Sequence, residues 1–276
     1  MARKGRGAPV RDREIIVKSA AEIARMRRAG QVVALTLQRL AQAARPGVTT
    51  GELDRIAEAT IRSFGATASF YNLYGYPAHI CASVNDEVVH GIPGDRALKE
   101  GDIISFDVGA TVEEMIADGA LTVGVGPISP EAERLLRVTR EALRLGLKQA
   151  RAGKRVRDVA QAVQRHVESH GYSVVRQLVG HGVGRAMHEA PQVPNFVDAG
   201  APGREALVPG MTLAIEPMVN QGGAEVVQDR DGWTYRTQDG SLSAHFEHTV
   251  VVMDQGCEIL TQRPAPGRGA VGETAQ

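Results

Sequence analysis

The sequence predicts an α+β fold made of two copies of one unit, each a pair of helices followed by strands of a largely antiparallel sheet. A pattern of leucine, glycine and a final carboxylate occurs twice, in residues 98–107 (LKEGDIISFD) and 207–216 (LVPGMTLAIE). Upstream, residues 44–65 align with residues 150–171 at one constant offset, and both stretches carry apolar residues at helical spacing. Runs of strands with hairpin-like returns between the helix pairs complete the prediction.

Local signals predict where the four helices begin. Capping boxes start the first two, over about residues 19–46 and 49–64. Ser129 caps the third helix, which has Pro130 at its first position. The fourth lies in the matched segment 150–171. Their apolar stripes are predicted to be core faces without chemistry.

Strands fill most of the remaining chain, and the predicted ones are residues 78–84, 102–112, 121–125, 212–215 and 248–253. The two repeated strands are apolar up to Asp107 and Glu216, so each carboxylate has neighbours that belong in a core. A buried, unpaired carboxylate must be protonated, paired with a cation or bound to a metal. Two of them at equivalent positions of a duplicated unit predict a site on a pseudo-twofold axis.

Asp118 is a third candidate ligand. It follows Asp107 by eleven residues, so a hairpin would bring the two carboxylates face to face across paired strands. Because two such carboxylates repel each other, a cation between them is the simplest explanation. The alternative is that Asp118 is a turn residue before Gly119.

His181 and Glu247 complete the candidate ligand set. The glycines around His181 in GHGVGR (residues 180–185) let the backbone pass close to a ligand, although a lone histidine is often structural. The segment is a poor phosphate loop because no Lys-Ser/Thr follows it. Glu247 precedes a strand of valines. Four carboxylates and one imidazole must be shared to hold two ions, as in two-metal hydrolases with ions roughly 3.5 to 4 Å apart.

Composition indicates a soluble, enzyme-sized protein. The 276 residues, 43% hydrophobic and 23% charged, suffice for one large domain, predicted at residues 15–263. A net charge of +0 favours neither specific nucleic acid nor membrane as partner. Without a long apolar run or signal peptide, we expect a cytoplasmic location with Cys81 and Cys257 reduced. Because no exposed apolar stripe is evident, we expect a monomer.

The two ends of the chain differ from the rest. Residues 1–14 read as a flexible basic arm, for which a solvated tail is the expected role and a transient ribosome or RNA contact the alternative. Residues 264–276 are rich in proline, glycine and alanine, which predicts a disordered tail.

Six motifs together resemble the methionine aminopeptidases of peptidase family M24, in order and spacing. They are residues 83–93 (SVNDEVVHGIP), 105–108 (SFDV), 180–185 (GHGVGR), 187–191 (MHEAP), 215–220 (IEPMVN) and 243–249 (SAHFEHT). The resemblance covers residues 14–263. The short interval from Glu216 to Glu247 resembles that of type I enzymes, and the lack of a cysteine-rich or proline-rich N-terminal extension suggests the bacterial form. The resemblance implies a pita-bread (creatinase/aminopeptidase) fold and a single catalytic metalloaminopeptidase domain.

The resemblance also implies two divalent ions, Co²⁺, Mn²⁺, Fe²⁺ or Zn²⁺. Asp107 would chelate one ion, His181 and Glu216 would hold the other, and Asp118 and Glu247 would bridge them. Glu216 would also move protons during hydrolysis. The activity implied is removal of initiator methionine from nascent polypeptides that have a small second residue.

Substrate contacts are implied in the same way. His188 would stabilise the developing oxyanion and His90 would contact the scissile amide, although without the resemblance both read as core or surface histidines. The methionine pocket would be formed by Tyr76, Cys81, Met187 and Trp233, whose alternative role is ordinary core.

Three residues depart from the family pattern. Gly119 follows Asp118 where a hydroxyl residue is common, Gly109 replaces a frequent threonine, and Met187 replaces a frequent aromatic residue. We therefore expect changed hydrogen bonds around the metal ligands and a more pliable pocket wall. Two other functions remain open: a catalytically silent pita-bread binding module, and a proline-specific relative such as prolidase.

Overall fold

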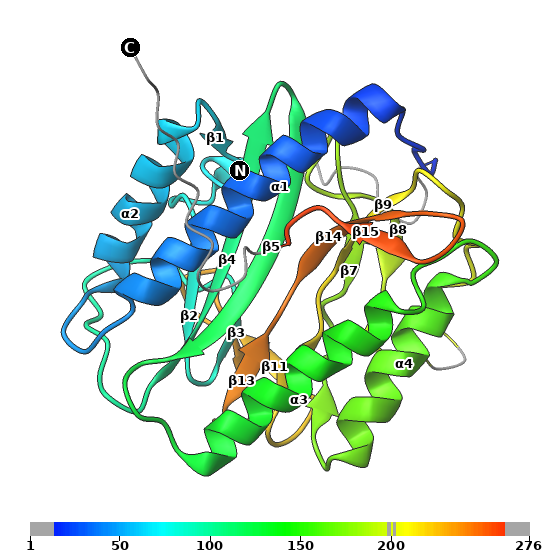
Figure 1. Ribbon diagram of the computed structural model, residues 1–276. Helices are drawn as coiled ribbons and strands as arrows, with labels where there is room; N and C mark the ends of the chain where they lie inside the picture. Colours follow the sequence, from blue (N-terminus) through cyan, green and yellow to red (C-terminus); the bar gives the residue numbers. More distant parts are fainter. Residues whose placement is uncertain (1–13, 198–199, 201–202, 263–276) are drawn as a thin grey trace, which may run out of the picture.

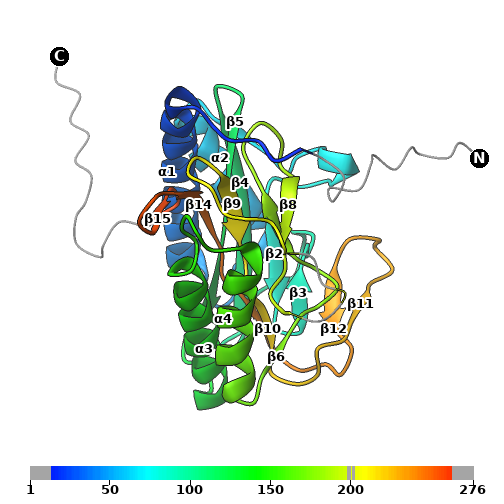
Figure 2. The same ribbon diagram turned by 90° about the vertical axis from the view of Figure 1, so that its right-hand side faces the viewer.

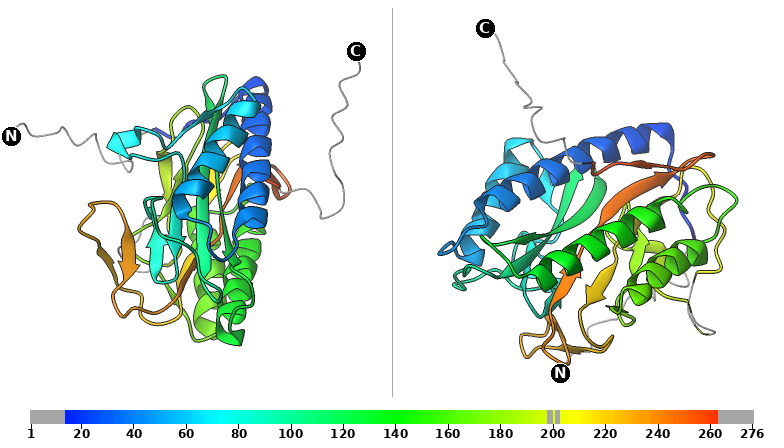
Figure 3. Two further views of the ribbon diagram at one scale, coloured as in Figure 1. Left: turned by 90° about the vertical axis from the view of Figure 1, so that its left-hand side faces the viewer. Right: turned by 60° about the horizontal axis from the view of Figure 1, so that its bottom comes forward.

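The computed structural model describes residues 14–197, 200 and 203–262. In this part of the chain, two helix pairs lie on one side of the strands (Figures 1 and 2). The helices are α1 (Ala20–Ala43), α2 (Thr50–Ser63), α3 (Pro130–Leu147) and α4 (Val156–Ser169). The right view of Figure 3 shows one pair over each half of the molecule. The predicted α+β architecture with duplicated helix pairs is confirmed.

Antiparallel pairing joins the strands into four small sheets. The first contains β1 (Thr67–Ala68), β2 (Cys81–Val84), β4 (Ile103–Val112) and β5 (Met115–Gly124). Another contains β7 (Gly180–Gly182), β8 (Glu189–Val193), β9 (Thr212–Ile215), β14 (His248–Val252) and β15 (Cys257–Ile259). Two three-stranded sheets are formed by β6 (Ser173–Val174), β10 (Met218–Asn220) and β13 (Ser243–His245), and by β3 (Glu87–Val89), β11 (Val226–Gln228) and β12 (Tyr235–Thr237). A short 3-10 turn, η2, spans Leu73–Gly75.

The helices begin where the local signals predict. Ser19 and Thr49 each accept a backbone hydrogen bond at the third helical position, and the glutamate there bonds back to the cap. Ser129 caps α3 with Pro130 at its start. The helices pack their apolar faces on the strands, and α1 buries a stripe that includes Met26, Val33 and Leu37. None of the described helices combines the length and the hydropathy that a membrane span requires.

The repeated glycines have the same backbone conformation. Gly101 precedes β4 with φ of 91°, and Gly210 precedes β9 with φ of 86°. This left-handed region favours glycine because a Cβ atom would be strained there. Asp107 lies within β4 and Glu216 directly follows β9, so the duplicated turns deliver the two carboxylates to equivalent places.

The β4–β5 hairpin corrects two details of the prediction. Its turn is at Glu113 and Glu114, both with positive φ, and β5 starts at Met115 rather than near residue 121. Asp118 is therefore a strand residue and not a turn residue. The register pairs Asp107 with Ala120 and Asp118 with Gly109, so the two carboxylates are diagonal neighbours on one face rather than face to face.

Further predictions concern the two ends of the chain, the cysteines and the strand at residues 78–84. The basic arm falls almost entirely, and the C-terminal tail entirely, outside the described residues. Within them, Cys81 and Cys257 are both free. The predicted strand 78–84 is shorter, because pairing begins at Cys81.

Candidate active site

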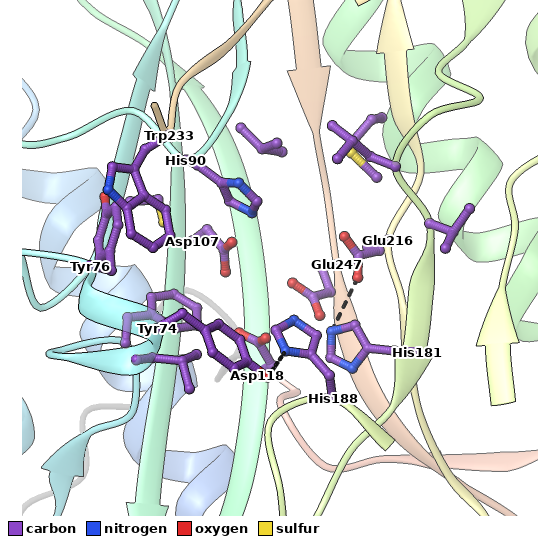
Figure 4. Close-up of a pocket in the computed structure, with 17 residues that line it drawn as sticks. Tyr74, Tyr76, His90, Asp107, Asp118, His181, His188, Glu216, Trp233 and Glu247 are labelled. Atoms are coloured by element: carbon purple, nitrogen blue, oxygen red, sulfur yellow. Dashed lines mark hydrogen bonds and ion pairs between the residues drawn. The ribbon is translucent and has the colours of Figure 1, made fainter. Parts of the chain in front are cut away.

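One cavity of about 200 Å³ is lined by ten of the eleven site residues that the sequence predicts. It has a charged end and an apolar end (Figure 4). The charged end is lined by Asp107, Asp118, His181, Glu216 and Glu247, with His90 and His188 beside them. The apolar end is lined by Phe70, Leu73, Tyr76, Cys81 and Trp233, and Met187 packs in the same cluster. Trp233 from the β11–β12 connection and Tyr76 from the loop before β2 thus meet across the fold.

The charged end has ligand spacing suited to a metal ion. One ligand atom each of Asp118, His181 and Glu247 lie within 4.8 Å of one another, and all three residues are buried. Asp107 and Glu216 line the same end, with Glu216 Oε1 3.5 Å from His181 Nε2. The five residues come from both halves of the molecule. The Glu247 N–H donates to the Ala120 carbonyl at 3.1 Å, which ties the halves together at the site.

The carboxylates lack enough counter-charge of their own. Burial raises the pKa of Asp107 to about 7, although a hydrogen bond with Asp118 opposes the rise. Burial, with repulsion from neighbouring carboxylates, raises the pKa values of Asp118, Glu216 and Glu247 well above the ordinary range. Asp107 Oδ1 and Glu247 Oε1 are buried without a hydrogen-bond partner among the described residues. A bound cation would satisfy these oxygens, so the donor set fits a metal centre.

His181 is prepared as a neutral ligand. Its Nδ1 lies 2.8 Å from the Gly182 carbonyl, which can only accept a hydrogen bond, so Nδ1 carries the proton. Nε2 is then the lone-pair nitrogen, and it faces the carboxylates. Burial, followed by the neighbouring His188, lowers the pKa of His181 to about 3. A neutral imidazole fixed through its other nitrogen is the form that binds metals.

His188 and His90 lie over the charged end from opposite sides (Figure 4). The His188 ring centroid is 4.5 Å from that of His181, while burial and the charge of His188 lower the pKa of His90 to about 4. His90 sits at φ of 60°, a left-handed conformation that aims its ring into the cavity. At neutral pH, His90 can therefore donate one N–H to a substrate without carrying charge.

Sequence reasoning missed two residues of this site. His245 is buried with Nε2 3.6 Å from Glu216 Oε2, and burial lowers its pKa to about 3. The available signal was its place two residues before Glu247, with which it approaches the site. Tyr74 lines the cavity mouth, with its hydroxyl 3.4 Å from His188 Nδ1 and its side chain 70% exposed. No sequence pattern marked Tyr74, because an exposed loop aromatic carries no periodic signal.

The apolar end forms one compact cluster. Tyr76, Cys81 and Met187 are buried, and the half-buried Trp233 meets Tyr76 edge to face at 5.1 Å between centroids. Gly109 lies beneath it, where an added Cβ would be 2.7 Å from Met187 Cε. Two departures from the family pattern therefore belong together, because the missing side chain at 109 makes the space that Met187 fills.

Gly119 is explained by packing on the other face. A Cβ there would lie 3.1 Å from Val33 Cγ1 of α1. Asp118 is nevertheless held without a neighbouring hydroxyl residue, because its N–H donates to Thr249 Oγ1 at 2.8 Å and its carbonyl accepts from the same hydroxyl at 2.7 Å. The Thr249 hydroxyl thus orients Asp118 from β14.

A match to metallopeptidase family M24 covers residues 24–254. The chain belongs to this family. It is 52% identical over 248 residues to a methionine aminopeptidase of Clostridium perfringens, which covers 90% of this chain and 98% of that protein. It is 43% identical over 251 residues to the methionine aminopeptidase of Escherichia coli, covering 90% and 94% of the two chains. The predicted resemblance to methionine aminopeptidases is confirmed.

Solved structures agree. The crystal structure of a Thermotoga maritima methionine aminopeptidase superposes with a TM-score of 0.88 at 43% identity, covering 91% of this chain and all of that one. The prolidase of Pyrococcus furiosus superposes with a TM-score of 0.71 at 19% identity, which shows the fold alone, and the match covers 66% of that chain. The predicted pita-bread fold is confirmed by these neighbours.

Proposed function

We propose that this protein removes N-terminal methionine from polypeptides with the help of two divalent metal ions. The observation that carries the proposal is the continuity of one cavity, in which the ligand cluster of Asp118, His181 and Glu247 adjoins a pocket of aromatic and sulfur side chains. Such a pocket suits an unbranched thioether, because aromatic rings and sulfur make favourable soft contacts. Relatives similar in sequence and in structure are named methionine aminopeptidases.

The five candidate ligands would share the two ions. Asp107 would chelate one ion, His181 and Glu216 the other, and Asp118 and Glu247 would bridge them. Mostly oxygen donors with one imidazole suit Mn²⁺, Fe²⁺, Co²⁺ or Zn²⁺. When bound, such ions polarise the scissile carbonyl and acidify a shared water.

The protein's own side chains supply the proton transfers. Glu216 takes a proton from the attacking water and passes it toward the leaving amine. His245 lies at the Glu216 oxygen that does not face His181, with Nε2 3.6 Å from Oε2. It would restrict rotation of the Glu216 carboxylate. His188 donates a hydrogen bond to the developing oxyanion, and His90 donates to the scissile amide.

Selectivity for a small second residue would arise at the cavity mouth. Tyr74 stacks on His188 with centroids 5.9 Å apart, and His90 faces them across the opening. A bulky side chain after the methionine would meet these rings. The substrates would be nascent chains in the cytoplasm, handled by a monomer, with the basic arm available for a transient ribosome contact.

Peptide hydrolysis separates this function from its alternatives. We expect metal-supplied protein to cleave Met-Ala-Ser and Met-Gly peptides, and to leave Met-Lys and Met-Phe peptides intact. Equal cleavage of Met-Ala and Met-Phe peptides would indicate a general aminopeptidase. Preferential cleavage of Gly-Pro peptides would indicate a proline-specific enzyme, and inactivity on all of them with metal bound would indicate a binding module.

A further inference from the structure

A buried ion pair lies beneath the loop that carries Met187 and His188. The side chains of Lys18 and Glu189 are 1% and 3% exposed, and Lys18 Nζ donates to Glu189 Oε2. Lys18 Nζ also donates to the Ile16 carbonyl at 3.1 Å. The two charges are 171 residues apart in the chain, so this contact is made by the tertiary structure alone.

The second oxygen of Glu189 holds the loop. Its Oε1 accepts from the Arg185 N–H at 2.6 Å and from the Ala186 N–H at 3.0 Å. These bonds close a short loop of residues 185–189, and Met187 and His188 are the two residues between the anchored ends. One carboxylate thus fixes the stretch that supplies a wall of the methionine pocket and an imidazole over the charged end.

The segment before α1 anchors the cation. The Lys18 N–H donates to the Gly210 carbonyl at 2.9 Å, and Val17 forms a bridge with Met211 just before β9. Lys18 also packs closely on the loop, because a Cβ added at Gly184 would lie 2.4 Å from Lys18 Cε. The position of the Lys18 ammonium group is therefore fixed by its own backbone hydrogen bond and by the packing of its side chain against Gly184.

A second contact joins α1 to the same loop. Arg185 Nε donates to Glu22 Oε1 at 2.6 Å, and Glu22 belongs to the capping box that begins α1. This outer pair is more exposed than the inner one, with the Arg185 side chain 54% exposed. The inner pair is the one that is shielded from water.

We propose that Lys18 and Glu189 are positioning residues that hold Met187 and His188 at the cavity. The proposal rests on the proposed function, because peptide cleavage is one of its readouts. Removing one charge leaves the other buried without a partner, which is far more costly than removing both. The loop must then move or admit water, and a displacement of about 1 Å at a substrate-contacting group can cost about 100-fold in rate.

The test uses the variants Lys18→Met and Glu189→Gln and the double variant. The control is the exposed ion pair of Arg27 and Glu258, which links α1 to β15 and whose side chains are 46% and 35% exposed. We expect each inner single variant to lower kcat/KM on Met-Ala-Ser by about 10- to 100-fold per folded molecule, with metal content unchanged. The double variant keeps an acceptor oxygen for the loop N–H groups and should recover most of the loss. Arg27→Met and Glu258→Gln should stay within about twofold.

A readout independent of turnover keeps the two proposals separable. In methionine-methyl NMR, the Met187 signal, assigned with Met187→Leu, should shift in Glu189→Gln and stay in place in Glu258→Gln. Wild-type inactivity on Met-Ala-Ser would defeat the proposed function, while the Met187 shift would still support the positioning role. The positioning role would be overturned by a Met187 signal that does not move. It would also be overturned if the single variants lose thermal stability while kcat/KM per folded molecule is unchanged.

Discussion

The charged end of the cavity collects four carboxylates whose pKa values are raised by burial, whereas the apolar end collects buried aromatic and sulfur side chains. Both halves of the duplicated fold contribute residues to the charged end, and a hydrogen bond from the Glu247 N–H to the Ala120 carbonyl joins the two halves there. The apolar end depends on close packing, as the contact between Gly109 and Met187 shows. Substitutions at the charged end should therefore change chemistry, and those at the apolar end should change substrate binding.

The largest effect is expected from Glu216→Gln. The amide cannot take a proton and is a weaker metal donor, so kcat should fall by about 10³-fold or more. Circular dichroism should show an intact fold, and the exposed Glu225→Gln in the same half is the matched control. Near wild-type turnover would contradict the role of the charged end in chemistry.

His188→Ala should give the next largest loss. Removing one oxyanion donor costs about 10²–10³ in kcat. Metal analysis should show unchanged content, because His181 and not His188 belongs to the ligand cluster. His170→Ala, at the C-cap of α4 and outside the lining of this cavity, should leave activity unchanged. Loss of a metal ion in His188→Ala would show that the roles of the two histidines are wrongly divided.

Metal affinity should rise with pH. In the metal-free protein, burial raises the pKa of Asp107 to about 7, so the folded state holds protons that an unfolded aspartate releases near pH 4. The folded state binds more protons over this interval, and its stability therefore falls as pH rises from about 4 to about 7. Metal binding needs the ionised form, so affinity should increase about tenfold per pH unit for each proton released.

Two titrations check this behaviour. Calorimetric metal binding in buffers of different ionisation enthalpy should show proton release below about pH 7, and thermal unfolding after chelation should show lower stability at pH 7 than at pH 5. Metal affinity that does not change with pH would mean that the carboxylates are already ionised and paired in the metal-free protein.

The smallest effect is expected at the apolar end. Gly109→Ala places a methyl against Met187 Cε and should narrow the pocket, raising KM for Met-Ala-Ser by about tenfold while kcat changes little. Gly94→Ala, where an added Cβ meets nothing within 4 Å, is the control. Combining Gly109→Ala with Met187→Ala should restore KM, and a fall in kcat instead would show that the two ends are not separable.

The candidate metal ligands differ in how far the sequence predicts them. Asp107 and Glu216 stand out because the repeat marks them twice, and His181 because glycines flank it. Asp118 stayed open between ligand and turn, since Asp-Gly is a local turn signal. Long-range contacts exclude the turn, because β5 pairs with β4 along its full length and Thr249 from β14 bonds to the backbone of Asp118.

Other features have no local signal at all. Tyr74 is exposed in an irregular loop, and His245 approaches Glu216 only because β13 pairs with β10. The relation between Gly109 and Met187 likewise requires knowing that a residue of β4 and a residue of the loop between β7 and β8 share one pocket wall. When each position is compared with the family pattern on its own, Gly109 and Met187 count as two separate departures.

The sequence by itself determined the starts of the helices, the repeated glycine turns and the apolar strands. These depend on interactions within three or four residues, such as Ser19 with Glu22, or on the φ that a single glycine adopts. Only the tertiary structure decided that His181 Nε2 faces Glu216, and that Lys18 neutralises Glu189 beneath the substrate loop. The charge state of a buried group depends on the groups that folding brings within about 4 Å of it, and here those groups are distant in the chain.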